Sequence, residues 1–122
     1  MQRLRTRAQF QALLAERPVA RTPHFAWHRL QEPVPADGST ASQGPWLGAL
    51  VPKRWARRAV TRNAIRRQVH ALGAARLAAL PGAHLIRLRA AFPVDAFPSA
   101  SSRALKRAVR AELEQLLAQA RP

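Results

Sequence analysis

The stretch from Lys53 to Arg67 holds the side chains of this chain that are best suited to binding chemistry. Seven of its fifteen residues are lysine or arginine, and none is acidic. Over the longer interval between Asp37 and Asp95 there are ten basic side chains and no carboxylate. Like charges gathered in this way repel one another, so they do not favour folding. The pattern predicts that a polyanion binds there, and RNA or DNA is the leading candidate.

The other reactive residue types do not form a pattern that predicts catalysis. The six acidic residues are scattered, and no two have a spacing that suggests a metal site. His24 and His28 are four residues apart, which would matter on a helix, but their segment is predicted to be a strand. His70 and His84 are isolated, and there is no glycine-rich phosphate-binding loop. We therefore predict that the polypeptide supplies no catalytic residue and no metal site.

The composition is typical of a folded and strongly basic protein. The chain of 122 residues is 48% hydrophobic, so it can bury a core, and its net charge is +15. This balance favours nucleic acid or a strongly acidic surface as the partner, bound more weakly as salt rises. The sequence has no cysteine, no apolar run that could span a membrane and no apolar signal segment after its basic N-terminus. We expect a cytoplasmic protein with no membrane partner and no small-molecule cofactor.

Hydrophobic spacing predicts the elements that lead into the basic stretch. A first short helix is expected at residues 6–16 and a strand at 24–30. Residues 32–45 contain proline, glycine, serine and aspartate, which predicts an exposed hairpin loop. A second strand is expected at residues 46–51, where Pro52 stops it.

The pattern in the second half of the sequence predicts a long helix, a strand and a second long helix, in that order. Residues 59–80 have helical character, bent or broken near Gly73, and residues 84–88 form the third predicted strand. A last helix begins near Ser101 or Ser102, either of which can cap it. Its apolar stripe consists of Leu105, Val109, Leu113, Leu116 and Leu117.

The helix predicted at residues 59–80 has two different flanks. At about 100° per residue, Ile65, Val69 and Leu72 lie together and can pack on a sheet. The flank that faces solvent contains Arg62, Asn63, Arg66, Arg67 and His70. The order of helix, two or three strands, helix, strand and helix predicts a small α+β sandwich whose sheet packs against helices. We expect a single domain over residues 1–122.

Three aromatic residues have two open interpretations. Phe10, Phe25 and Trp27 are either core residues or platforms on which the bases of a single-stranded nucleic acid stack. The basic stretch has an alternative as well, because a run of charge is often only a solvated helix face. Here the run joins a strand end, a loop and a helix face, which favours a nucleic-acid surface. Asn63 within it can orient its neighbours or bond to RNA directly.

The pattern resembles the protein subunit of bacterial ribonuclease P. The resemblance rests on Leu47-Gly48, on Pro52-Lys53-Arg54 and on Arg57-Arg58-Ala59-Val60-x-Arg62-Asn63-x-Ile65-Arg66-Arg67. The family signature is a strand that ends in paired basic residues, then a helix with an Arg-Asn-Arg core followed by Ile-Lys-Arg. Ala64 stands at the position of the second arginine in that core. The similarity spans nearly the whole chain.

The resemblance implies a ribonucleoprotein that matures the 5′ end of precursor tRNA. Its RNA subunit is the catalyst and acts with bound Mg²⁺, which the RNA and the substrate hold. The protein binds that RNA through the arginine-rich helix and holds the 5′ leader of precursor tRNA in a cleft between the sheet and the first helix. The residues expected to face the catalytic RNA are Lys53, Arg54, Arg57, Arg58, Arg62, Asn63, Arg66 and Arg67. The candidates for the leader cleft are Phe10, Phe25 and Trp27.

Two other functions are weighed against this one. The first is a ribosomal or general RNA-binding protein without a role in cleavage. The second is a DNA-binding architectural protein, which is disfavoured because the sequence shows no helix-turn-helix spacing and no dimer zipper.

Overall fold

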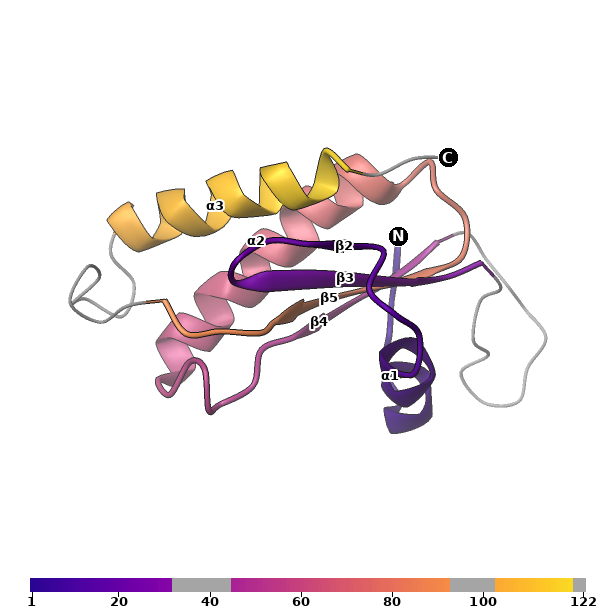
Figure 1. The fold of residues 1–122 in the computed structure, drawn as a ribbon, viewed down its shortest axis with the longest axis horizontal. Helices are drawn as coiled ribbons and strands as arrows, with labels where there is room; N and C mark the ends of the chain where they lie inside the picture. The colour runs from indigo at the N-terminus through magenta and orange to yellow at the C-terminus, as the bar shows by residue number, and fades with distance from the viewer. Residues whose placement is uncertain (32–44, 93–102, 120–122) are drawn as a thin grey trace.

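The computed structural model describes residues 1–31, 45–92 and 103–119. A five-stranded sheet has one short helix on one face and two longer helices on the other (Figure 1). This arrangement confirms the predicted α+β class. The elements in chain order are β1 (Gln2–Arg3), α1 (Arg7–Leu14), β2 (Ala20–Arg21), β3 (Phe25–Leu30), β4 (Trp46–Leu50), α2 (Ala59–Leu77), β5 (Ala83–Leu88) and α3 (Arg103–Leu117).

The order of strands in the sheet is β1-β4-β5-β3-β2. β5 pairs in parallel with β4 and antiparallel with β3, so it lies between them. The hairpin predicted between the strands at residues 24–30 and 46–51 is therefore wrong, because β3 and β4 are not neighbours in the sheet. Parallel strands need a crossover connection, and α2 provides it by carrying the chain from the end of β4 to the start of β5. Most of the predicted loop, residues 32–44, lies outside the described residues.

The two outer strands of the sheet, β1 and β2, were not predicted from the sequence. β1 pairs in parallel with β4, and β2 pairs antiparallel with β3. Each has two residues, and two residues cannot show the alternation by which a strand is recognised. They extend the sheet at both edges without adding a core of their own.

Alternation along the strands gives the sheet two apolar faces. Phe25, Trp27, Ile86 and Leu88 face α2 and α3 in the larger core. That core also contains the predicted packing flank of α2 and the whole predicted stripe of α3, which confirms both. On the other face a smaller cluster packs under α1, and its buried members are Leu4, Leu13, Trp46, Ala83 and Leu85.

Helix α1 begins at a complete capping box. Thr6 Oγ1 accepts a hydrogen bond from the Gln9 backbone N–H at 3.2 Å, and Gln9 Oε1 accepts from the Thr6 N–H at 3.0 Å. Two backbone donors at the start of the helix are satisfied in this way. The helix ends two residues before the predicted end, and Phe10 packs from it onto the smaller core.

Helix α2 runs without a break through Gly73, so the predicted break is absent. Gly73 is buried, and a Cβ atom there would lie 2.5 Å from Leu47 Cδ2 of β4. The glycine therefore serves the close approach of the helix to the sheet. Helix α3 begins at Arg103, and the predicted capping serines, Ser101 and Ser102, lie outside the described residues.

We predict that Gly82→Ala destabilises the fold by about 1–3 kcal/mol. Gly82 has φ +99°, and a Cβ atom there would lie 2.1 Å from the Leu30 carbonyl oxygen, which is backbone and cannot rotate away. Gly73→Ala is the matched control. Its Cβ atom would meet the Leu47 side chain, which can shift where a backbone carbonyl cannot, and a gain of about 1 kcal/mol in helix propensity offsets part of the cost, so its loss of stability should be smaller. Chemical denaturation measures both, and equal losses of stability would contradict this explanation.

Candidate nucleic-acid interface

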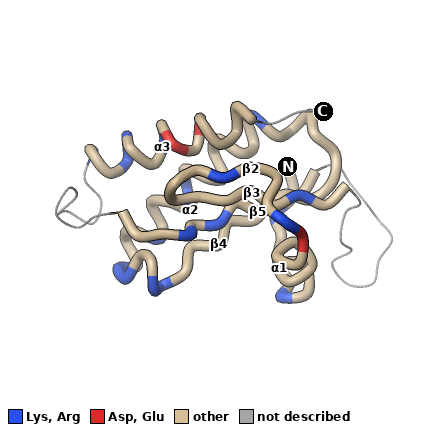
Figure 2. The backbone as a smooth tube through the Cα atoms, viewed as in Figure 1, with Lys and Arg blue, Asp and Glu red and all other residues tan. Residues whose placement is uncertain are grey.

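The basic stretch follows β4 through a short turn onto the exposed side of α2. The backbone N–H groups of Trp55 and Ala56 donate to the Pro52 carbonyl at 3.0 and 3.1 Å, which folds the connection tightly. Basic residues occupy this turn at the edge of the molecule (Figure 2). The exposed ones are Lys53, Arg54, Arg57 and Arg58.

Arg62 connects the turn to the helix. Its Nη1 donates to the Ala56 carbonyl at 3.0 Å and to the Arg57 carbonyl at 2.7 Å. The side chain is half-buried and reaches back from the first turn of α2 to the residues that precede it. Arg62 therefore stabilises the turn between β4 and α2 through these two hydrogen bonds. Its expected contact with RNA stays a prediction.

Further along α2, three polar residues form an exposed ridge. Arg66 Nη1 donates to Asn63 Oδ1 at 3.1 Å, so the amide orients the guanidinium one turn away. Arg67 lies beside them and is exposed. We call Arg57, Arg58, Asn63, Arg66 and Arg67 the α2 basic face.

A shallow groove of about 540 Å³ borders this ridge on the side of β1. Arg66 and Arg67 line it together with Arg3 and His70. Burial, and then the charge of Arg3, lower the pKa of His70 below its usual value, so its imidazole is neutral at pH 7. Arg3 comes from the far end of the sequence and adds a cation that the central stretch does not reveal.

Two of the described carboxylates, Glu112 and Glu114, are engaged with residues outside this basic surface. Glu112 accepts hydrogen bonds from Thr22 Oγ1 and the His24 N–H, both at 2.6 Å, and lies 2.7 Å from His24 Nδ1. Glu114 lies within 3.7 Å of Arg76 and Arg110. Within residues 1–31, 45–92 and 103–119, no ion pair involves the α2 basic face. Its positive potential therefore has no counter-charge from the described protein.

The start of α2 adds to that potential. Its N-cap residue, Arg58, makes no side-chain capping hydrogen bond, and the first turn contains no acidic residue. Backbone N–H groups give the N-terminus of a helix a partial positive charge, and cations beside it are unfavourable unless an anion binds. The N-terminus of α2 and the basic side chains around it thus both favour an anionic ligand.

A second group of arginines lies on the face of the sheet that carries α1. Arg87 points to this face from β5. Burial lowers the pKa of Arg87, and the charges of Arg89, Arg54 and Arg21 lower it further. These four guanidiniums, the α1-face patch, come from β2, β5 and the two loops that follow β4 and β5. The sequence predicts that Arg54 faces the catalytic RNA. In the structure its charge lies close enough to Arg87 to lower the pKa of that residue.

His28 fixes the position of Arg87. Arg87 Nε donates to His28 Nε2 at 2.9 Å, so that nitrogen accepts and the proton of the neutral imidazole is on Nδ1. Nδ1 in turn donates to the Glu16 carbonyl at 2.8 Å. Burial lowers the pKa of His28, which maintains the neutral form. Arg87 is not among the site residues predicted from the sequence, although an arginine in the middle of an apolar strand is a usable signal.

The structure corrects two of the three aromatic candidates. Phe25 is 0% and Trp27 2% exposed, and both belong to the core against α2 and α3. They point away from the α1 side because side chains alternate along β3, so they cannot line a cleft beside α1. Phe10 is half-buried on α1 and is the one candidate of the three that stays on that side.

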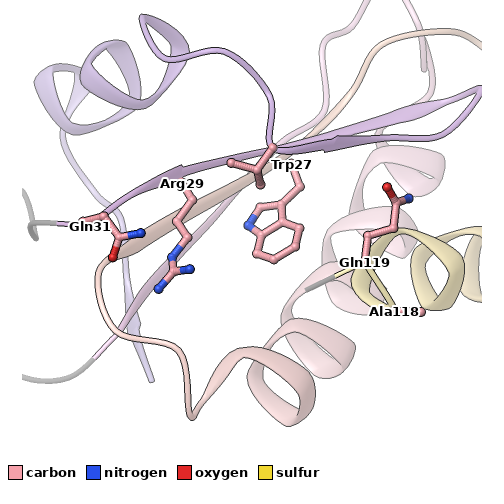
Figure 3. A pocket seen from close by; sticks show the side chains of 6 residues that line it. Trp27, Arg29, Gln31, Ala118 and Gln119 are labelled. Carbon is pink, nitrogen blue, oxygen red and sulfur yellow. The ribbon is translucent and has the colours of Figure 1, made fainter. Parts of the chain in front are cut away.

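Trp27 has a structural role in its core. Its Nε1 donates to His84 Nδ1 at 3.1 Å, and His84 Nε2 donates to the Leu80 carbonyl at 3.1 Å. The indole borders a cavity of about 530 Å³, opposite Ala118 and Gln119 at the end of α3 (Figure 3). This cavity is on the side of the sheet away from α1.

The described residues offer no catalytic constellation. No group of three or more histidine, cysteine, aspartate or glutamate side chains among them could hold a metal ion. None of the described helices is long and apolar enough to cross a membrane. What the described residues do provide is cations on two faces of the sheet.

A family model described as Ribonuclease P matches residues 1–121. The chain belongs to the ribonuclease P protein family. It is 39% identical over 115 residues to the ribonuclease P protein component of Ralstonia pickettii, covering 93% of this chain and 75% of that protein. It is 34% identical over 110 residues to the component of Paraburkholderia xenovorans, covering 89% and 73%.

The fold agrees with this family. The structure of Staphylococcus aureus RNase P protein matches with a TM-score of 0.66 at 20% identity, over 97% of this chain and 94% of that one. As a ribonuclease P protein, the chain is the protein subunit of an endoribonuclease holoenzyme in tRNA 5′ processing, with ribonuclease P RNA as its partner. The family match decides against the ribosomal and DNA-architectural alternatives.

We predict that Arg62→Ala loosens the turn between β4 and α2. The variant loses two hydrogen bonds to backbone carbonyls, which lowers the free energy of unfolding by about 1 kcal/mol. Amide hydrogen exchange should become faster at residues 53–58. Arg66→Ala is the matched control, since that side chain bonds only to Asn63 in the described structure. Unchanged exchange in the turn of the Arg62 variant would show that this residue does not hold it.

Proposed function

We propose that the α2 basic face binds ribonuclease P RNA through its phosphates. The observation that carries this proposal is the set of exposed guanidiniums around the start of α2 without a described carboxylate beside them. Arginine matches phosphate oxygens with two parallel N–H donors, and contacts of this kind position an RNA without reading its sequence. Asn63 supports the site by orienting Arg66.

We further propose that the α1-face patch holds the 5′ leader of precursor tRNA. The patch lies on a different face from the α2 basic face, so one protein can contact two RNAs at once. Two linked hydrogen bonds, from Arg87 to His28 and from His28 to the Glu16 carbonyl, pre-orient the Arg87 guanidinium there, which reduces the entropy lost on binding. Phe10 beside the sheet is the remaining aromatic candidate for contact with leader bases. Phosphate contacts of this kind would tolerate different leader sequences.

In this proposal the RNA subunit carries out the cleavage. Mg²⁺ is the metal that the family resemblance implies, and the side chains that the structure describes do not fit it, because no group of three or more histidine, cysteine, aspartate or glutamate residues among them could hold a metal ion. Of the three described carboxylates, Glu112 and Glu114 are paired with other residues, and the two surfaces proposed to face RNA are cationic. We therefore assign the metal to the RNA subunit and the substrate, where phosphate oxygens are suitable ligands. The protein contributes binding and orientation.

We predict that the purified chain increases cleavage of precursor tRNA by a bacterial ribonuclease P RNA at low Mg²⁺. The protein should also make a substrate with a leader bind more tightly than a leaderless one. Arg87→Ala should remove most of that difference because it deletes the central cation of the α1-face patch. The exposed Arg107 on α3 is the control, and Arg107→Ala should keep the difference. Cleavage that is not enhanced, with equal binding of both substrates, would refute the proposed function.

We predict that Arg66→Ala combined with Arg67→Ala weakens binding of ribonuclease P RNA by on the order of tenfold at about 0.15 M salt. The double variant should retain its fold, because both side chains are exposed and neither bonds outside α2 in the described structure. Filter binding with the RNA subunit alone measures the effect. An affinity equal to that of wild type would show that this ridge does not face the RNA.

A further inference from the structure

A second groove borders the same ridge on its other side, between α2 and α3. Its volume is about 520 Å³, and Asn63 and Arg67 line it as they line the groove beside β1. Lys106 lines it from α3, a helix that the basic stretch does not include. The ridge of α2 therefore has a cationic groove on each side.

The lining of this α2–α3 groove suits the backbone of a nucleic acid. Short side chains, Ala64 and Ala71, leave the space open on the α2 side. Arg67 and Lys106 put cations on different helices, and none of the described residues that line the groove is a carboxylate. Val60 at the beginning of α2 is 57% exposed and offers an apolar contact for a sugar or base.

The two helices that form the sides of the groove, α2 and α3, are fixed relative to each other. Gln68 Nε2 of α2 donates to the Lys106 carbonyl at 3.3 Å, and below it the helices share the larger core. The backbone at Lys106 is thus tied to α2, while its side chain remains exposed. A fixed spacing between two cations lowers the cost of binding a ligand that contacts both.

We propose that the α2–α3 groove binds a phosphodiester segment of ribonuclease P RNA, with Lys106 as a phosphate contact. This inference rests on the proposed function, because Arg67 belongs both to the α2 basic face and to the groove. That continuity favours RNA over an acidic protein as the occupant. The RNA surface of the protein thereby extends from α2 onto α3.

The test compares Lys106→Ala with Arg107→Ala in binding to ribonuclease P RNA. Both variants remove one exposed cation from neighbouring positions of α3, but Arg107 does not line the groove. Lys106→Ala should weaken binding about three- to tenfold at about 0.15 M salt and make the salt slope shallower by about 0.7–0.9. Arg107→Ala should change the affinity less than twofold.

Two further variants test whether the effect belongs to this groove. Lys106→Arg keeps the cation and should bind like wild type. Ala64→Arg, added to Lys106→Ala, returns a cation to the same groove from α2 and should restore most of the lost affinity. Equal effects of Lys106→Ala and Arg107→Ala, or no restoration by Ala64→Arg, would overturn the groove proposal.

Failure of this inference can be told apart from failure of the proposed function. If the Arg66 and Arg67 double variant binds more weakly while Lys106→Ala does not, the α2 basic face stands and the groove is refuted. If the wild-type chain does not bind the RNA, or the double variant binds it equally well, the proposed function itself is refuted.

Discussion

The structure depends on holding many positive charges close together, and among the described residues no ion pair neutralises those of the α2 basic face. The described carboxylates that contact side chains are Glu112 and Glu114, and their partners, Thr22, His24, Arg76 and Arg110, lie outside the α2 basic face. Repulsion among the arginines of the α2 basic face must therefore be offset by apolar burial on both faces of the sheet. The same repulsion disappears when phosphates bind, so the feature that costs stability in the free protein becomes favourable in the complex.

Two contacts set where those charges lie. Gly73 lets α2 approach Leu47 of β4 closely, and Arg62 ties the preceding turn to the helix through the carbonyls of Ala56 and Arg57. Both contacts belong to the crossover from β4 through α2 to β5. The basic residues are thus carried by packed elements, which keeps the spacing of the cations fixed before RNA arrives.

The sequence predicts the features that depend on local spacing. Period-3.6 patterns identified the buried flanks of α2 and α3, and the signature around Asn63 identified the family. Alternation correctly put Phe25 and Trp27 on one face of a strand, but it could not say which face meets α1. The place of β5 between β3 and β4 depends on strand pairing, which local spacing does not encode. Arg3, Arg87 and Lys106 join the cationic surfaces only through tertiary folding, so a search for runs of charge could not find them.

The central claim is that this protein binds ribonuclease P RNA with unneutralised cations, and the salt dependence of that binding tests it most directly. The equilibrium constant of the wild-type chain for the RNA subunit should be measured over a range of monovalent salt at constant Mg²⁺. If the four arginines of the α2 basic face contact phosphates, the slope of log K against log salt should be roughly −3 or steeper. A slope shallower than about −1 would contradict the account, because it would leave no more than one phosphate contact.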